Sequence, residues 1–270
     1  MSVSEITIFL LYVLAAGAFT LHRLPAYEMR SRPLLVGAVI LALTALLLHA
    51  RALGLEIFDR EGLKLSIAAA ISIIGLQLAL IGLLGAFDRS LRGMSAGLLA
   101  LAAFASGATA FQSSTADIVQ RTWQIETHIL VSMFAYGLLT AGAIVAIYAL
   151  ILDRRLRGAH LSAASQLFAP LETTEKMLFG VATGGFIVLL LAVVSGFAFV
   201  DNLFAQHLVH KTVFSLIAVT LFGVLVAGRL FAGWRGRRAV YLYLWGFAFL
   251  CLAYFGSRFV LEQILGRSWR

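Results

Sequence analysis

Long apolar stretches recur along this chain, and each is about as long as the hydrocarbon core of a bilayer is thick. A helix rises about 1.5 Å per residue, so about 20 mainly apolar residues are needed to cross that core. Such stretches lie at roughly residues 5–22, 34–50, 65–87, 94–111, 128–152, 177–200, 210–231 and 239–261. They predict an all-α, polytopic integral membrane protein with about eight transmembrane helices.

Charged residues make up 13% of the 270-residue chain, which is about half their share in a soluble domain. The middle of each predicted span lacks Asp, Glu, Lys and Arg, whereas ion-coupled transporters place ionisable groups at that depth. A small-molecule transporter is therefore the weakest functional alternative. The longest inner loop, 153–176, is too short for a separate domain, so we expect one transmembrane domain over residues 1–270.

An excess of basic residues marks the side of a membrane protein that faces the cytoplasm. If the N-terminus lies outside, thirteen of the 21 Lys and Arg residues fall on the inner side and the other eight on the outer side. The excess is clearest in the loops DRRLR and GWRGRR, and it predicts that both termini lie outside. Basic residues confined to short loops argue against nucleic-acid binding. The segment MSVSE carries no Lys or Arg, so we expect the first stretch to be a retained span and not a signal peptide.

Four of the six histidines share one predicted level, at the outer face of the membrane. They are His49, His128, His207 and His210. Imidazoles bind both zinc and haem iron. A zinc site is one interpretation, because His207 and His210 are three residues apart and Asp201 precedes them. The single cysteine, Cys251, excludes a C-x-x-C-H site for covalent haem attachment.

A non-covalent, b-type haem needs axial imidazoles, an apolar slot and cations for its propionates. The aromatic residues at the outer level are Trp123, Phe197, Phe199, Phe204 and Phe214. The cations at that level are Arg121, Lys211 and Arg258. The outer face therefore offers the groups that a haem site requires.

Three stretches of the second half carry a more specific pattern. The first is ETHILVSMFAYGLLTAGAIVAIYALILDRRL, which opens with an external histidine and continues through an Ala-Tyr pair. The second is PLETTEKMLFGVATGGFIVLLLAVVSGFAFV. The third and most specific is HKTVFSLIAVTLFGVLVAGRLFAGWRGRRAVYLYLWGFAFLCLAYFG. Together, over residues 120–262, they resemble the cytochrome c assembly family, the haem-handling membrane proteins that include CcsA and CcmC, and within it the short, eight-span YpjD-type branch. The first four spans resemble the family in hydropathy alone.

The resemblance implies a pair of external histidines that act as axial ligands of haem iron. By position, His128 matches the first of them. His210 matches the second, because it directly precedes the Lys-Thr pair that opens the following span. His207 and His49 are alternatives for that second ligand.

The family's tryptophan-rich signature, W-G-x-x-W-x-W-D, is expected just upstream of the second histidine. That place reads SGFAFVDN in this chain. Phe197 and Phe199 stand where tryptophans are expected, and Asp201 keeps the acidic end. The change argues against covalent haem attachment to apocytochrome c, the full synthase activity.

The leading interpretation is a haem-binding protein of the bacterial inner membrane, with both termini on the periplasmic side, that assists cytochrome c maturation or haem handling. Its expected partners are membrane lipids and a cytochrome c maturation protein or another membrane protein. The alternative is a haem-free scaffold or accessory subunit that stabilises a partner protein. The sequence contains no evident nucleophile or acid/base pair, so we expect no independent catalytic activity.

Overall fold

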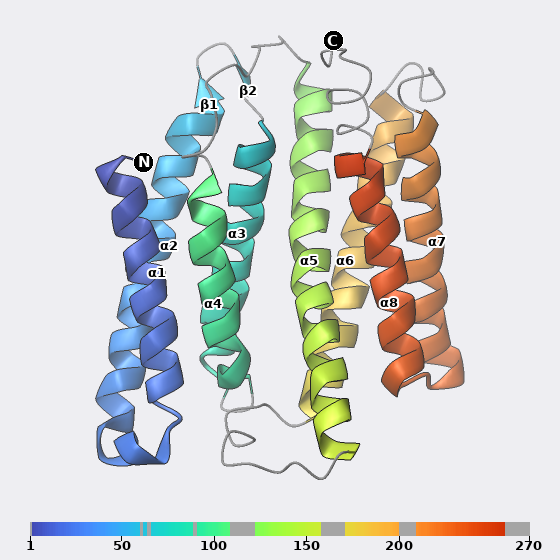
Figure 1. The fold of residues 1–270 in the computed structure, drawn as a ribbon. Helices are drawn as coiled ribbons and strands as arrows, with labels where there is room; N and C mark the ends of the chain where they lie inside the picture. The colour runs from blue at the N-terminus through green and yellow to red at the C-terminus, as the bar shows by residue number, and fades with distance from the viewer. Residues whose placement is uncertain are drawn as a thin grey trace. The chain divides into compact units, whose positions relative to one another are not determined.

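The computed structural model describes residues 2–59, 62–63, 66–88, 91–108, 122–157, 171–199 and 209–256. Across these ranges the chain is almost entirely helical, as predicted, with eight long α-helices (Figure 1). Two strands of two residues each, β1 (Phe58–Asp59) and β2 (Gly62–Leu63), pair in antiparallel fashion between the second and third helices.

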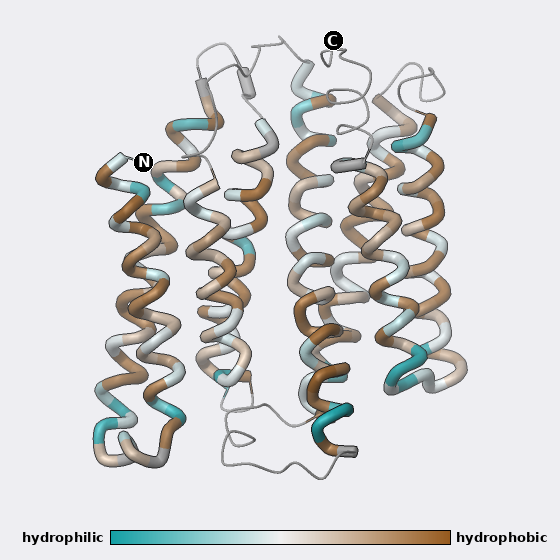
Figure 2. The backbone as a smooth tube through the Cα atoms, viewed as in Figure 1, coloured by the Kyte–Doolittle hydropathy of each residue, from teal (hydrophilic) through white to brown (hydrophobic). Residues whose placement is uncertain are grey.

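Six of the described helices are long and apolar enough to cross a membrane. They are α1 (Val3–Leu21), α2 (Ser31–Ile57), α3 (Ile67–Gly85), α5 (Trp123–Arg157), α6 (Leu171–Phe199) and α7 (Val209–Ala232). Two helices are shorter, α4 (Arg92–Ser106) and α8 (Gly236–Cys251), and α8 continues as a π-helical turn, η4 (Leu252–Gly256). Hydrophobic residues fill the middles of the helices, and hydrophilic ones gather near their ends (Figure 2). The chain is therefore a polytopic membrane protein.

Helix α2 buries small residues and exposes large apolar ones, as expected where lipid is the solvent. Helix α2 buries Ala38, Ala42 and Ala45 along one face, whereas Leu47 on the same helix is 61% exposed. Small residues allow helix backbones to approach closely, and this packing replaces the hydrophobic effect as the main attraction between membrane helices.

The described residues form two compact units. The first comprises residues 1–122 and 151–174, and the second comprises residues 123–150 and 175–270. In the first unit, α1 and α2 are joined through the 3₁₀ segment η1 (Pro25–Arg30) and pack with the α3–α4 hairpin. A Cβ on Gly75 of α3 would lie 2.5 Å from the Cβ of Ala105 on α4. The close approach of these two helices thus requires glycine at position 75.

The second unit is a bundle of α5, α6, α7 and α8. The starts of α5 and α7 lie at the same end as the ends of α6 and α8 (Figure 1). Two buried tyrosine hydroxyls join α5 to α8: Tyr136 donates to the carbonyl oxygen of Leu250 at 2.7 Å, and Tyr243 donates to that of Leu139 at 2.9 Å. Each hydroxyl meets a backbone carbonyl in an apolar interior, so both bonds fix the register of the two helices.

The structure moves two helix boundaries that bear on the candidate histidines. Helix α2 runs to Ile57, past the predicted end at residue 50, so His49 lies within the helix and not at its end. Helix α5 begins at Trp123, before the predicted start at residue 128, so His128 lies in its second turn. Polar residues such as Arg51 and Glu56 are good helix formers, so these helices extend beyond their apolar segments. That the whole chain acts as one transmembrane domain stays a prediction.

Candidate functional site

The predicted site residues that the structure places in the second unit lie at one end of its bundle. His128 comes from the start of α5, Phe197 and Phe199 from the end of α6, and His210 and Lys211 from the start of α7. Figure 1 shows these three helix termini at the same end. The fold thus brings His128 to the same end of the second unit as residues that lie 69 or more positions after it in the sequence.

His128 makes a side-chain hydrogen bond to a serine of α6. Its Nδ1 lies 2.9 Å from Oγ of Ser195 on α6, and that Oγ lies 2.8 Å from the carbonyl oxygen of Ala192, to which it can donate. While Ser195 gives its one proton to that carbonyl, it accepts from the Nδ1–H of His128. In the neutral ring the lone pair then lies on Nε2. This is the tautomer in which histidine binds a metal through Nε2 while Nδ1–H bonds to a supporting group.

Gly196, next to Ser195, lets α6 pack directly against the His128 ring. A Cβ at position 196 would lie 3.0 Å from Cε1 of His128. The ring is partly buried and is held through Nδ1 on one edge and by the backbone of α6 beside it. Ser195 and Gly196 together set the direction in which Nε2 points.

The start of α7 adds an exposed imidazole and a cation at the same end of the bundle. His210 is exposed, whereas Lys211 is partly buried. The ammonium of Lys211 lies 5.9 Å from the centre of the Tyr254 ring in η4. A cation beside the candidate ligand is placed to pair with an anionic group of a bound molecule.

Exposed aromatic side chains complete this end of the second unit. Phe197 is 49% exposed, Phe199 36% and Trp123 69%. Phe214 instead packs against Phe249, with ring centres 6.1 Å apart. The site therefore combines an imidazole, a basic side chain and apolar surface, the groups that suit a haem with its iron, propionates and flat apolar faces.

His49 lies in the first unit and has a different environment. It is 2% exposed. Its Nδ1 is 3.2 Å from the hydroxyl of Tyr12 on α1, and its Nε2 is 2.8 Å from Oγ of Ser72 on α3. Both ring nitrogens are thus engaged, and binding of iron by His49 would require one of these bonds to break.

Five predicted site residues lie outside the described ranges: Asp201, Phe204, His207, Arg121 and Arg258. Among the described residues, no group of three or more His, Cys, Asp and Glu side chains is arranged to hold a metal ion. Sequence reasoning missed Ser195, Gly196 and Tyr254. A serine or glycine in an apolar helix carries no signal of function, and the contact between α5 and α6 that gives both their role is visible only in the folded chain.

The sequence of this chain is similar to one protein family and to individual bacterial proteins. The family model described as "Cytochrome C assembly protein" matches residues 8–265, so the match includes the first four helices as well as residues 120–262. The chain is 36% identical over 137 residues to "Inner membrane protein YpjD" of Escherichia coli K12, covering 51% of this chain and 52% of that protein. It is 30% identical over 175 residues to the "Uncharacterized 28.8 kDa protein in nifR3-like 5'region" of Azospirillum brasilense, covering 63% of each. These alignments thus span about half to two thirds of the relatives' lengths. No solved structure matches the chain significantly.

Proposed function

Because this chain belongs to the cytochrome c assembly protein family, we propose that it is a haem-binding protein of the bacterial inner membrane that assists cytochrome c maturation or haem handling. The observation that carries the proposal is the state of His128. Its Nδ1 lies 2.9 Å from Oγ of Ser195, so Nε2 is the ring nitrogen that lies outside this bond. The Escherichia coli relative is named as an inner membrane protein, which supports the proposal that this chain lies in the inner membrane.

In this proposal His128 and His210 are the axial ligands of a non-covalent, b-type haem. His128 of α5 and His210 of α7 would hold the haem iron through their imidazoles. His210 is preferred to His49 as the second ligand, because His210 is exposed at the same end of the unit as His128, while the nitrogens of His49 already contact Tyr12 and Ser72. His207 remains an alternative outside the described residues.

The remaining groups bind the edges and faces of the haem. Lys211 pairs with a propionate through a charge-assisted hydrogen bond, and Arg121 and Arg258 are further candidates outside the described ranges. Phe197 and Phe199 cover the apolar faces of the porphyrin. Asp201 keeps the acidic end of the family signature and is not assigned a contact.

The proposal includes an orientation. Both termini lie on the periplasmic side, so that the end of the second unit with His128 and His210 faces the periplasm. Fusion of alkaline phosphatase, which is active only in the periplasm, to the C-terminus tests this directly. An active fusion supports the orientation, and an inactive fusion at normal expression overturns it.

The haem proposal is tested by expressing the full chain in haem-replete cells and recording the absorbance of the purified protein. We expect a Soret band that is lost in the double variant His128→Ala, His210→Ala. His22→Ala is the matched control, because it removes an imidazole whose Nδ1 contacts the Ser31 carbonyl oxygen in the first unit, and it should keep the band. If the wild-type protein shows no Soret band, or if the double variant keeps it, the site is wrong.

A further inference from the structure

At the opposite end of the second unit, α7 and α8 are joined by a short turn whose shape depends on glycine. Gly233 and Gly236 have φ values of 62° and 65°, in the left-handed region that other residues adopt only at a cost. Between them, the Trp234 amide donates to the carbonyl oxygen of Gly228 at 3.0 Å. The sequence GWRGRR thus specifies a defined turn and not merely a charged loop.

Helices α6 and α7 hold this turn in place. The Trp234 ring packs on Gly228 of α7 so closely that any Cβ there would overlap it. Arg229 of α7 donates from Nη1 to the carbonyl oxygen of Trp234 at 3.2 Å, and its guanidinium lies 4.5 Å from the centre of the Phe179 ring on α6. From α6, the Glu175 carboxylate accepts the Gly236 amide at 2.9 Å.

The braced turn presents three exposed guanidinium groups: Arg235, Arg237 and Arg238. Arg238 is stacked over the Trp234 ring, with its guanidinium carbon 4.3 Å from the ring centre. Guanidinium groups bind phosphate oxygens through paired hydrogen bonds.

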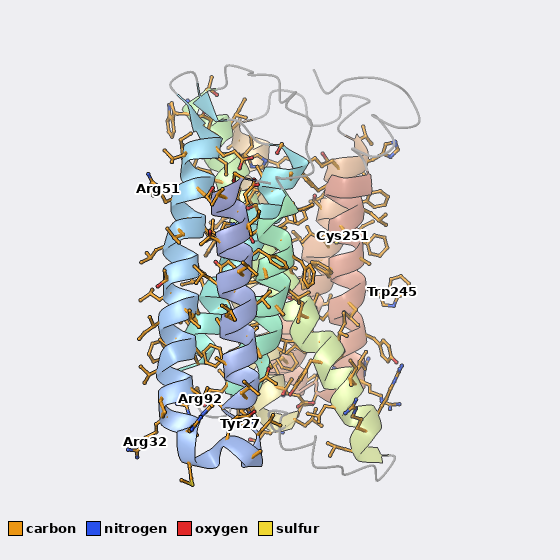
Figure 3. All side chains as sticks on the ribbon, turned by 60° about the vertical axis from the view of Figure 1, so that its left-hand side comes forward. Tyr27, Arg32, Arg51, Arg92, Trp245 and Cys251 are labelled. Carbon is orange, nitrogen blue, oxygen red and sulfur yellow. The ribbon has the colours of Figure 1, made fainter. Side chains whose placement is uncertain are left out.

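Apolar surface adjoins these cations. Tyr241 and Trp245 follow Arg238 by three and seven residues, so they share its face of α8, and they are 46% and 63% exposed. The Trp245 side chain points away from the bundle (Figure 3). Phe231, at the end of α7, is 90% exposed. A phosphate-binding cluster next to exposed apolar side chains on membrane helices matches the two parts of a phospholipid.

We propose that the α7–α8 turn is a binding site for an anionic phospholipid. The headgroup phosphate binds Arg235 and Arg237, Arg238 is held beside them by Trp234, and the acyl chains lie along Tyr241 and Trp245. The site lies at the other end of the second unit from His128 (Figure 1), so it does not depend on haem binding. The charge of the turn and the exposed apolar side chains that follow it on α8 favour a lipid over an acidic protein segment.

The experiment uses the full chain purified in a neutral detergent. Native mass spectrometry measures the fraction of protein that carries phosphatidylglycerol, which is anionic, or phosphatidylcholine, which has no net charge, and inorganic phosphate serves as a competitor. We expect phosphatidylglycerol to bind more tightly than phosphatidylcholine. Each arginine near an anionic headgroup contributes on the order of a 5-fold gain in affinity, so the double variant Arg235→Gln, Arg237→Gln should bind phosphatidylglycerol roughly 30-fold more weakly.

The matched control is Arg32→Gln, Arg154→Gln, which removes two exposed arginines of the same predicted membrane side that lie outside the turn. It should bind phosphatidylglycerol as the wild type does. Equal weakening in both double variants would show a general charge effect and overturn the proposal. Undiminished binding by the Arg235, Arg237 variant, or displacement of the lipid by inorganic phosphate at equal concentration, would overturn it as well.

Discussion

The hydrogen bond between Ser195 and His128 gives the sharpest test of the haem site. In Ser195→Ala the Nδ1–H of His128 loses its acceptor at 2.9 Å. The free ring can respond by rotating or by taking the other tautomer. When Nε2 is bound to iron, however, Nδ1 must keep its proton, and that partly buried donor has lost its serine acceptor. The penalty therefore falls on the haem-bound state.

An unsatisfied buried donor costs about 1–3 kcal/mol, which corresponds to a loss of affinity of about 5- to 150-fold. Removal of a supporting partner of a metal-bound histidine typically weakens binding by about 10- to 100-fold. The two ranges agree, so we expect Ser195→Ala to bind haem about 10- to 100-fold more weakly than the wild type. Ser195→Thr keeps a hydroxyl and should restore most of the affinity.

The assay is a haem titration of protein produced without haem, followed at the Soret band. Ser132→Ala is the matched control, because Ser132 also donates to a backbone carbonyl one turn earlier, that of His128 itself, at 2.7 Å, and does not bond to the ring. It should bind haem as the wild type does. Equal affinities for Ser195→Ala and the wild type, or an equal loss in Ser132→Ala, would refute the argument from the tautomer.

Three further predictions follow from the same contacts. Lys211→Gln should weaken haem binding without changing the affinity for haem dimethyl ester, whose esterified propionates carry no charge to pair; an equal loss for both ligands would show a structural effect instead. Gly196→Val should lower haem affinity while keeping the helical circular dichroism spectrum, because a Cβ would lie 3.0 Å from Cε1 of His128 and turn the ring; an unchanged titration contradicts the placement of α6. Lowering the pH through the histidine range should release haem, because protonated imidazole has no lone pair for iron, and a Soret band that persists at low pH would point to ligands other than histidine.

The number and type of the helices could be predicted from the sequence, because the bilayer allows so few alternatives. A segment in hydrocarbon must satisfy its own backbone hydrogen bonds, so apolar length alone indicates a helix. The helix boundaries were harder to predict from the sequence. Hydropathy falls after residue 50, yet α2 continues to Ile57, because helical hydrogen bonding does not stop where the bilayer interior is expected to end.

The candidate ligands could be ranked from the sequence only by resemblance, whereas the structure separates them by their hydrogen-bond partners. His49 contacts two hydroxyls, of Tyr12 and Ser72, and each hydroxyl can donate or accept. Either tautomer of His49 is then satisfied, and a neutral imidazole with both nitrogens engaged serves as a polar link between α1, α2 and α3. In the sequence, His49 and His128 look alike, because each lies near the end of a predicted span. The sequence does not show which side chains form hydrogen bonds with either histidine.

At His128 the count of protons gives the opposite result. While Ser195 donates to the carbonyl of Ala192, it accepts from the ring, and in the neutral ring the other nitrogen then carries the lone pair. His49 has both ring nitrogens in hydrogen bonds, whereas Nε2 of His128 lies outside the bond to Ser195. Substitution of Ala192 cannot test this difference, since the acceptor is a backbone carbonyl. The paired substitutions at Ser195 and Ser132 can test it, because they remove two similar hydroxyls of which only one bonds to the His128 ring.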